Sequence, residues 1–245
     1  MKNNIYFIYL LLLAVLPVHS RNTSLFSVYE ITCEQQIEPS GIGSKSPRFG
    51  WKVACQQRGY RQSAYRILVA DTEDALTADK GTVWDSGTFL SSNSVLVPFQ
   101  GKELHSATRY YWKVKVWNEA GEESAWSRQG SFVTGIMKER DWGKAQWIAL
   151  EKDDSAKNLY PGIHAPLVRK MIGDRKVGGY KLPMFRKELP INKEVKEAIV
   201  NISGLGHFDF YINGEKVGNH FLDPGWTNYA KTALYQTFDV TALLK

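Results

Sequence analysis

The amino-acid sequence predicts an all-β protein built from two consecutive antiparallel β-sandwiches, the second of them incomplete. Short segments rich in β-branched and aromatic residues recur along the chain, and clusters of Gly, Pro, Ser and Asp separate them. The chain has 245 residues, enough for one large domain or two smaller ones after removal of a leader. It is 43% hydrophobic and 23% charged, which is the composition of a folded globular protein.

The first 20 residues have the organisation of a secretory signal peptide. Lys2 supplies a positive charge, residues 5–17 are apolar, and tolerated small residues precede a cleavage point before Arg21. We therefore expect a secreted or periplasmic protein with no membrane attachment after leader cleavage. An uncleaved N-terminal anchor is the alternative.

Residues 25–135 are predicted to form the first sandwich, because seven segments have the composition and spacing of its strands. These segments are residues 29–34, 48–53, 64–70, 82–87, 94–99, 108–118 and 130–134. Export would permit a disulfide between Cys33 and Cys55 in this domain, but two unpaired buried thiols fit the sequence equally well.

The clearest alternation lies in the 108–118 segment. It places Tyr110, Trp112, Val114 and Val116 on one face of a strand. A tyrosine just inside this strand can bend its hydroxyl back onto upstream backbone, as in a tyrosine corner. With the NEAGEESAWS segment that follows, the pattern resembles a fibronectin type III domain.

Five tryptophans of this domain are candidates for either a core or a contact role. Trp51 and Trp112 are expected in the sandwich core, with Trp84 half-buried. Trp117 and Trp126 are expected to face outward or to lie near a loop, where they are better placed to contact a ligand or another domain.

Residues 141–245 are predicted to form a second β-rich module. Residues 151–183 show no clear period and are interpreted as a long loop. Asn213-Gly214 is expected to turn a hairpin, because both residues tolerate a positive φ. The strands of this module are expected at residues 145–150, 184–189, 197–203, 208–214 and 234–241.

Three long motifs follow one another in the second module. They are Tyr211-Ile212-Asn213-Gly214, Pro224-Gly225-Trp226-Thr227-Asn228-Tyr229 and Tyr235-Gln236-Thr237-Phe238-Asp239-Val240-Thr241. In this order they resemble the N-terminal module of bacterial α-L-rhamnosidases of glycoside hydrolase family 78. The upstream segments VWDSG and YYWKVKVWN resemble the domain in front of that module. The resemblance covers residues 25–245 and implies a fibronectin type III-like sandwich, then a truncated galactose-binding-like (jelly-roll) sandwich.

The resemblance implies a parent enzyme that hydrolyses terminal α-L-rhamnose from glycans with two carboxylates of an (α/α)6 barrel. This chain shows no long helical repeats, so we expect it to lack that barrel and to be inactive alone. The local pairs Asp153-Asp154, in the long loop, and Glu122-Glu123, in a hairpin, are not expected to act instead. Adjacent strand residues face opposite ways, and adjacent acids in loops are usually solvated. The histidines show no metal-ligand spacing. We expect no catalytic residue, metal or cofactor.

The candidate carbohydrate-binding residues are Asp223, Trp226, Asn228 and Tyr229. They lie within seven positions of a Gly-Pro-rich turn and combine an aromatic platform with hydrogen-bonding groups. The alternative is that Trp226 and Tyr229 lock that turn onto the sheet or onto the missing barrel. A rhamnose-containing glycan or the missing catalytic domain is therefore the expected partner.

The net charge of +6 is mild and shared by both halves of the chain, so nucleic acid is not an expected partner.

The leading hypothesis is that the chain is the N-terminal accessory or substrate-recognition portion of a secreted α-L-rhamnosidase. A self-standing carbohydrate-binding or adhesion protein is the alternative, and a structural spacer is a third possibility. An unfinished sandwich would leave a strand edge and an apolar face uncovered.

Overall fold

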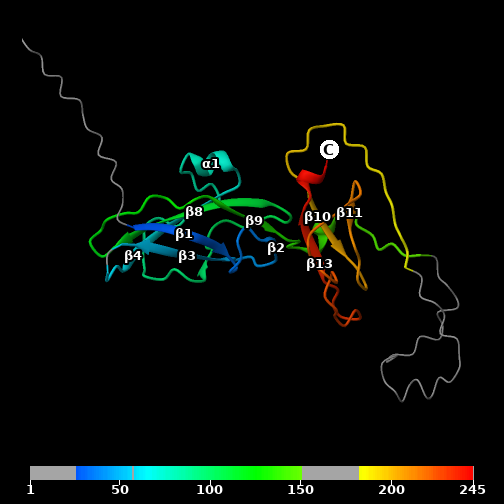
Figure 1. The fold of residues 1–245 in the computed structure, drawn as a ribbon, viewed down its shortest axis with the longest axis horizontal. Helices are drawn as coiled ribbons and strands as arrows, with labels where there is room; N and C mark the ends of the chain where they lie inside the picture. Colours follow the sequence, from blue (N-terminus) through cyan, green and yellow to red (C-terminus); the bar gives the residue numbers. More distant parts are fainter. Residues whose placement is uncertain (1–25, 57, 151–181, 245) are drawn as a thin grey trace, which may run out of the picture. The chain divides into compact units, whose positions relative to one another are not determined.

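A computed structural model describes residues 26–56, 58–150 and 182–244 of the protein. The chain divides into two compact units, with the boundary between Thr134 and Gly135 (Figure 1). The predicted leader and nearly all of the predicted 151–183 loop, including Asp153-Asp154, lie outside the described residues. Among the described residues, no helix has the length and apolar character needed to cross a membrane.

The first unit is a β-sandwich, as the strand pattern predicted (Figure 1). One sheet has the strand order β1-β3-β7 and the other the order β2-β9-β8-β4-β5, with β6 paired to β4. The pairings are antiparallel except that β2 runs parallel to β9. The strands are β1 (Phe26–Cys33), β2 (Ser40–Ile42), β3 (Arg48–Cys55), β4 (Gln62–Ala70), β5 (Trp84–Asp85), β6 (Phe89–Leu90), β7 (Val97–Pro98), β8 (Arg109–Asn118) and β9 (Gly130–Thr134).

The inner face of β8 carries the centre of the core. Its four alternating side chains, Tyr110, Trp112, Val114 and Val116, are at most 2% exposed. The ring of Phe49 on β3 lies 4.4 Å from the ring of Trp112, which joins the two sheets. Burying one large apolar side chain of this kind contributes about 1.5–3 kcal/mol. Trp51 is also buried and Trp84 is half-buried, as expected.

The predicted tyrosine corner is present, and its tyrosine is Tyr110. The backbone N–H of His105 donates a hydrogen bond to the Tyr110 hydroxyl at 2.9 Å. Leu104, just before it, is buried. This bond fastens the turn that leads into β8, a feature typical of immunoglobulin-like sandwiches.

The outer face of the larger sheet is covered by a short helix that the sequence analysis did not predict. This helix, α1 (Glu73–Thr77), begins after Thr72, whose hydroxyl accepts a hydrogen bond from the N–H of Ala75. Its Leu76 side chain is fully buried against Leu68 and Ala70 of β4. The sandwich therefore has a second small apolar cluster outside its main core.

Trp126 belongs to this outer cluster. Its ring lies 5.0 Å from the ammonium of Lys113 and 4.9 Å from that of Lys115. Lys113 is only 5% exposed, and its ammonium forms an ion pair with the Asp79 carboxylate. Trp126 and Trp117 are both half-buried. Trp126 thus packs within its own domain.

Neither cysteine is in a disulfide. They lie at opposite ends of the β1–β3 ladder, where Cys33 pairs with Phe49 and Cys55 pairs with Phe26. Seven strand positions separate these ends, which places the two Cα atoms roughly 23 Å apart at the rise of a strand. The Cα atoms of a disulfide lie within about 7 Å of each other. The two cysteines therefore form no disulfide with each other, and burial raises the pKa of the Cys33 thiol.

The second unit has fewer and shorter strands. β10 (Ile199–Ser203) pairs antiparallel with β13 (Tyr235–Asp239), and β11 (Tyr211–Ile212) pairs with β12 (Glu215–Lys216). The predicted hairpin is confirmed, since Asn213 and Gly214 form the two-residue turn with φ of 50° and 86°. Two 3₁₀ turns, at Glu139–Trp142 and Thr241–Leu243, complete the described elements of this unit.

Two predicted strands of the second unit are wrong. Residues 145–150 and 184–189 form no strand, although their composition suits one. Trp147, Ile148 and Met184 in these segments are 65–97% exposed. A strand needs a neighbour to accept its backbone hydrogen bonds, and no strand among the described residues lies alongside them.

The core of the second unit is small. It consists of Val217, Phe238 and Val240, covered by half-buried apolar side chains. The connector after Thr134 also packs onto this unit. The N–H of Ile136 donates to the Tyr235 hydroxyl at 2.7 Å, and the Trp142 ring meets the Tyr235 ring edge-on at 5.2 Å.

Candidate functional site

The four candidate residues lie in the loop between β12 and β13, in the second unit. Its Asp223–Pro224 peptide is cis. The N–H of Phe208 donates a hydrogen bond to the carbonyl of Asp223 at 2.8 Å. This bond joins the candidate loop to the loop that follows β10, so that segments 15 positions apart lie side by side.

Asp223 faces into the unit. Its side chain is 15% exposed, one carboxylate oxygen accepts from Gln236 Nε2 at 3.1 Å, and the other lies 3.1 Å from His220 Nδ1. Both oxygens therefore have partners within the chain, and the residue fastens its loop to β13.

Asn228 shapes a tight turn. Its side-chain oxygen accepts from the N–H of Ala230 at 3.1 Å, and its carbonyl accepts from the N–H groups of Lys231 and Thr232. The Thr227 hydroxyl donates to the carbonyl of Thr232 across the same turn. The side chain of Asn228 is thus engaged in local structure, as Asn often is in turns.

The two aromatic candidates are at the surface. Trp226 is 76% exposed and Tyr229 is 38% exposed. One side of the Trp226 ring is stacked on the imidazole of His207, with centroids 5.7 Å apart and planes inclined by 16°. The described residues therefore do not lock Trp226 onto the sheet.

Two histidines support the candidate loop, and the sequence analysis missed their role. His207 lies against Trp226, and His220 contacts Asp223. The His220–Asp223 contact has an i,i+3 spacing that is visible in the sequence. The His207 contact joins segments 19 positions apart, so no local pattern could have revealed it.

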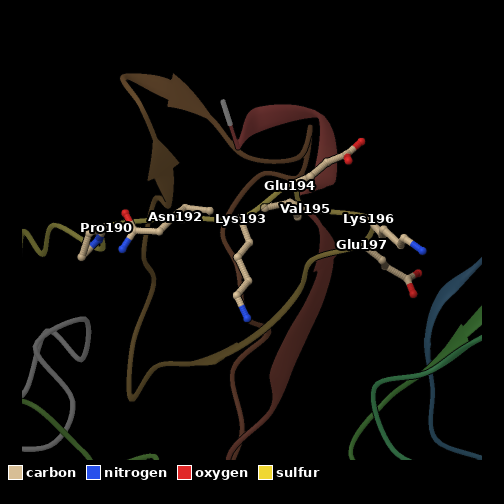
Figure 2. A pocket seen from close by; sticks show the side chains of 8 residues that line it. Pro190, Asn192, Lys193, Glu194, Val195, Lys196 and Glu197 are labelled. Carbon is tan, nitrogen blue, oxygen red and sulfur yellow. The ribbon is translucent and has the colours of Figure 1, made fainter.

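Two hollows of the second unit lack the convergent polar groups or the room that a sugar site needs. One lies between the β11–β12 hairpin and β13 and encloses about 10 Å³, which is room for about one water molecule. It is bordered by the Asp209–Lys216 ion pair at 2.6 Å. The other runs along residues 190–197, and Figure 2 shows side chains of this single segment pointing in several directions instead of converging.

The candidate pair Glu122-Glu123 and several other described carboxylates form structural contacts. Glu122 accepts from Asn118 Nδ2 at 2.7 Å, and Glu123 lies 3.3 Å from the ammonium of Lys115. In the first unit a hydrogen bond from Arg48 lowers the pKa of Glu34, and one from Lys113 lowers the pKa of Asp79. A general acid needs a raised pKa instead. The described residues include no group of three or more His, Cys, Asp or Glu suited to a metal ion.

Two family models match the chain, one in each unit. The model described as "Rha78A-like, N-terminal immunoglobulin domain" matches residues 28–138. The model described as "Alpha-L-rhamnosidase N-terminal domain" matches residues 193–245. They follow one another in the order that the sequence motifs implied.

The curated relatives that the chain matches are named α-L-rhamnosidases. An α-L-rhamnosidase of Formosa agariphila is 41% identical over 215 residues, which are 88% of this chain and 22% of the relative. An α-L-rhamnosidase of Alteromonas sp. is 31% identical over 210 residues, which are 85% of this chain and 21% of the relative. The chain thus spans about a fifth of the length of these relatives.

Solved structures agree with these matches. The α-L-rhamnosidase from Dictyoglumus thermophilum has a TM-score of 0.74 at 35% identity, covering 89% of this chain and 24% of that one. The enzyme from Aspergillus terreus has a TM-score of 0.65 at 25% identity, covering 90% of this chain and 22% of that one. The resemblance to the N-terminal region of α-L-rhamnosidases, inferred from the motifs, is confirmed.

Proposed function

We propose that this chain, which carries two N-terminal domains of α-L-rhamnosidases, is the accessory portion of such an enzyme and does not itself cleave the glycosidic bond. The observation that carries the proposal is the ordered match of both domain models, 28–138 and then 193–245. The activity of the whole enzyme would be hydrolysis of terminal α-L-rhamnose from glycans.

The chemistry of the described residues supports a non-catalytic role. An inverting glycosidase places two carboxyl groups about 6.5–9.5 Å apart around the bond and keeps one of them protonated. The acids with a clear pKa shift in the described part of the chain, Glu34, Asp79 and Asp85, are all held ionised by a cationic partner. Each of them serves an ion pair on the first sandwich.

The second unit supplies the surface through which the accessory portion would act. Trp226 and Tyr229 are available for contact, whereas Asp223 and Asn228 hold the loop in place. A rhamnose-containing glycan and the rest of the enzyme are the two occupants that the proposal allows there.

We further propose that the leader directs export, so that N-terminal sequencing of the mature protein would begin at Arg21.

A hydrolysis assay tests the proposed lack of catalysis. The purified chain, given an aryl α-L-rhamnoside, should release no aglycone above the buffer rate. The full-length F. agariphila relative serves as the positive control. Turnover that co-purifies with the chain through successive columns would overturn the proposal.

A chimera tests the proposed relation to the enzyme. The matched region of the F. agariphila relative, 22% of its length, is replaced by this chain. The chimera should hydrolyse the aryl rhamnoside, whereas the relative without that region should lose activity or solubility. A soluble, folded chimera without activity would contradict the proposed function.

A further inference from the structure

Between residues 205 and 234 of the second unit, six large apolar side chains outside the β11–β12 hairpin are exposed. They are Leu205, Phe221, Leu222, Trp226, Tyr229 and Leu234, with exposed fractions from 38% to 86%. We call this set the Trp226 surface. Single exposed apolar residues are ordinary, but a contiguous group of them marks an interaction site.

Contacts within the unit bring the loops of the Trp226 surface together. The Phe208–Asp223 bridge places the loop that carries Leu205 beside the loop that carries Phe221 and Leu222. The Ser203 hydroxyl donates to the carbonyl of Leu234 at 2.8 Å. A methyl group built at Gly225, next to Trp226, would lie 3.4 Å from the Leu234 side chain. The surface is therefore assembled from two adjacent loops, the one after β10 and the one between β12 and β13.

The chemistry of this surface fits protein better than sugar. A pyranose needs hydrogen-bonding groups beside its aromatic platform. Here Asp223 is turned inward, and the side-chain oxygen of Asn228 accepts a hydrogen bond in its own turn. The same loop instead exposes the apolar side chains of Phe221, Leu222 and Leu234, which suit the apolar centre of a protein interface with an aromatic anchor.

The described part of the second unit also has little apolar packing of its own. Its core has three buried residues, and its two sheets have two strands each among the described elements. Sheets of two strands are at best marginally stable by themselves. Each reported relative and solved enzyme is more than four times as long as the region that this chain matches. Further protein of the same polypeptide is therefore available to pack against this unit in those enzymes.

We propose that the Trp226 surface is a docking face for the remaining part of the full-length rhamnosidase. The proposal rests on the proposed function and deepens it by naming the occupant of the candidate site. Trp226 is the anchor that inserts into that partner, and His207 holds its ring in orientation from behind. Phe221 and Leu222 extend the apolar contact.

Hydrogen exchange in the chimera tests the docking directly. Amides of residues 221–234 should exchange at least about tenfold more slowly in the chimera than in the 245-residue chain, since about 1.4 kcal/mol of contact energy gives this ratio. This measurement does not depend on activity. Equal exchange in the two proteins would overturn the docking proposal even if the chimera is active, whereas slower exchange in an inactive chimera would overturn only the proposed function.

Substitutions identify the anchor. In the chimera, Trp226→Ala and Phe221→Ser should each accelerate heat inactivation by about tenfold, the effect of losing one interface hot spot. In the isolated chain they should leave the unfolding midpoint unchanged. Leu90→Ser, at an 83% exposed position on the first unit, is the matched control and should have no effect in either protein.

A sugar titration tests whether the Trp226 surface binds sugar instead of protein. L-Rhamnose should cause no saturable change in the tryptophan fluorescence of the 245-residue chain. A saturable change that Trp226→Ala abolishes would make the surface a sugar platform and overturn the docking proposal. Variants of Trp226 and Phe221 that inactivate no faster than Leu90→Ser would overturn it as well.

Discussion

The two units of this chain have similar strand-like sequences but very different interiors. The first unit buries a continuous aromatic and aliphatic core between two sheets, with Phe49, Trp112 and Phe132 in ring contact. Among the described residues of the second, the apolar core cluster consists of three buried residues, Val217, Phe238 and Val240. The first unit even covers the outer face of its larger sheet, whereas the second leaves Phe221 and Trp226 almost fully exposed.

This difference shows that a strand pattern specifies a strand only where a neighbour exists. Residues 64–70 and 108–118 have that pattern, and they pair with each other along β4 and β8. Residues 145–150 and 184–189 also have the composition of strands, yet they stay unpaired among the described residues. The first unit is a self-sufficient scaffold, and the second is arranged as one side of an interface.

The largest expected effect is a difference in the free energy of unfolding between two tryptophan substitutions, one in each unit. Trp112→Ala in the first core should lower the free energy of unfolding by about 3–5 kcal/mol, because it leaves a cavity between the sheets. Trp226→Ala in the isolated chain should change it by less than about 0.5 kcal/mol. Urea unfolding followed by circular dichroism measures both. Similar losses for the two variants would remove the contrast between the units.

The tyrosine corner should give the next largest effect. Tyr110→Phe keeps the buried ring but removes the acceptor of the His105 N–H, which should cost about 1–2 kcal/mol. Tyr211→Phe, at a 54% exposed position in the second unit, is the control and should be neutral. A neutral Tyr110→Phe would mean that the turn before β8 is held in place by packing alone.

The smallest effect depends on pH. The hydrogen bond from Lys113 lowers the pKa of Asp79, so the pair contributes stability above the unfolded pKa of about 4 and loses it as the pH falls through the lowered folded pKa. Asp79→Asn should therefore destabilise the first unit at pH 7, by about 1 kcal/mol because Asp79 is half exposed. The difference from the unsubstituted chain should shrink below about pH 4.

The control for this pH effect is Glu119→Gln, at an exposed hairpin position. It should leave the pH profile of thermal unfolding unchanged. A difference between Asp79→Asn and the parent that persists at pH 2 would show that the ionised pair is not its cause.

Much of the first unit could be predicted from local sequence, and the missing parts have a physical reason. Alternation in β8 identified its inner face and the tyrosine corner, because both depend on neighbouring residues. The helix α1 was overlooked although Thr72 followed by two acids is a helix-start signal. The burial of Lys113 could not be predicted, because it depends on Asp79 and Trp126 folding over the sheet.

The candidate site was predicted less completely. The sequence motif located the loop and its aromatic residues, and Trp226 and Tyr229 are indeed exposed. The motif did not show that Asp223 points inward, because its partner Gln236 lies 13 positions away, on strand β13. The direction of a side chain in such a loop is decided by contacts distant in the sequence.

Hydrogen exchange of the 245-residue chain alone tests the central claim, that the first unit is complete and the second awaits a partner. Amides of β8 should be protected up to global unfolding, whereas those of β10 and β13 should exchange at least about tenfold faster through local opening. Equal protection of β8 and β13 in the isolated chain would contradict this account.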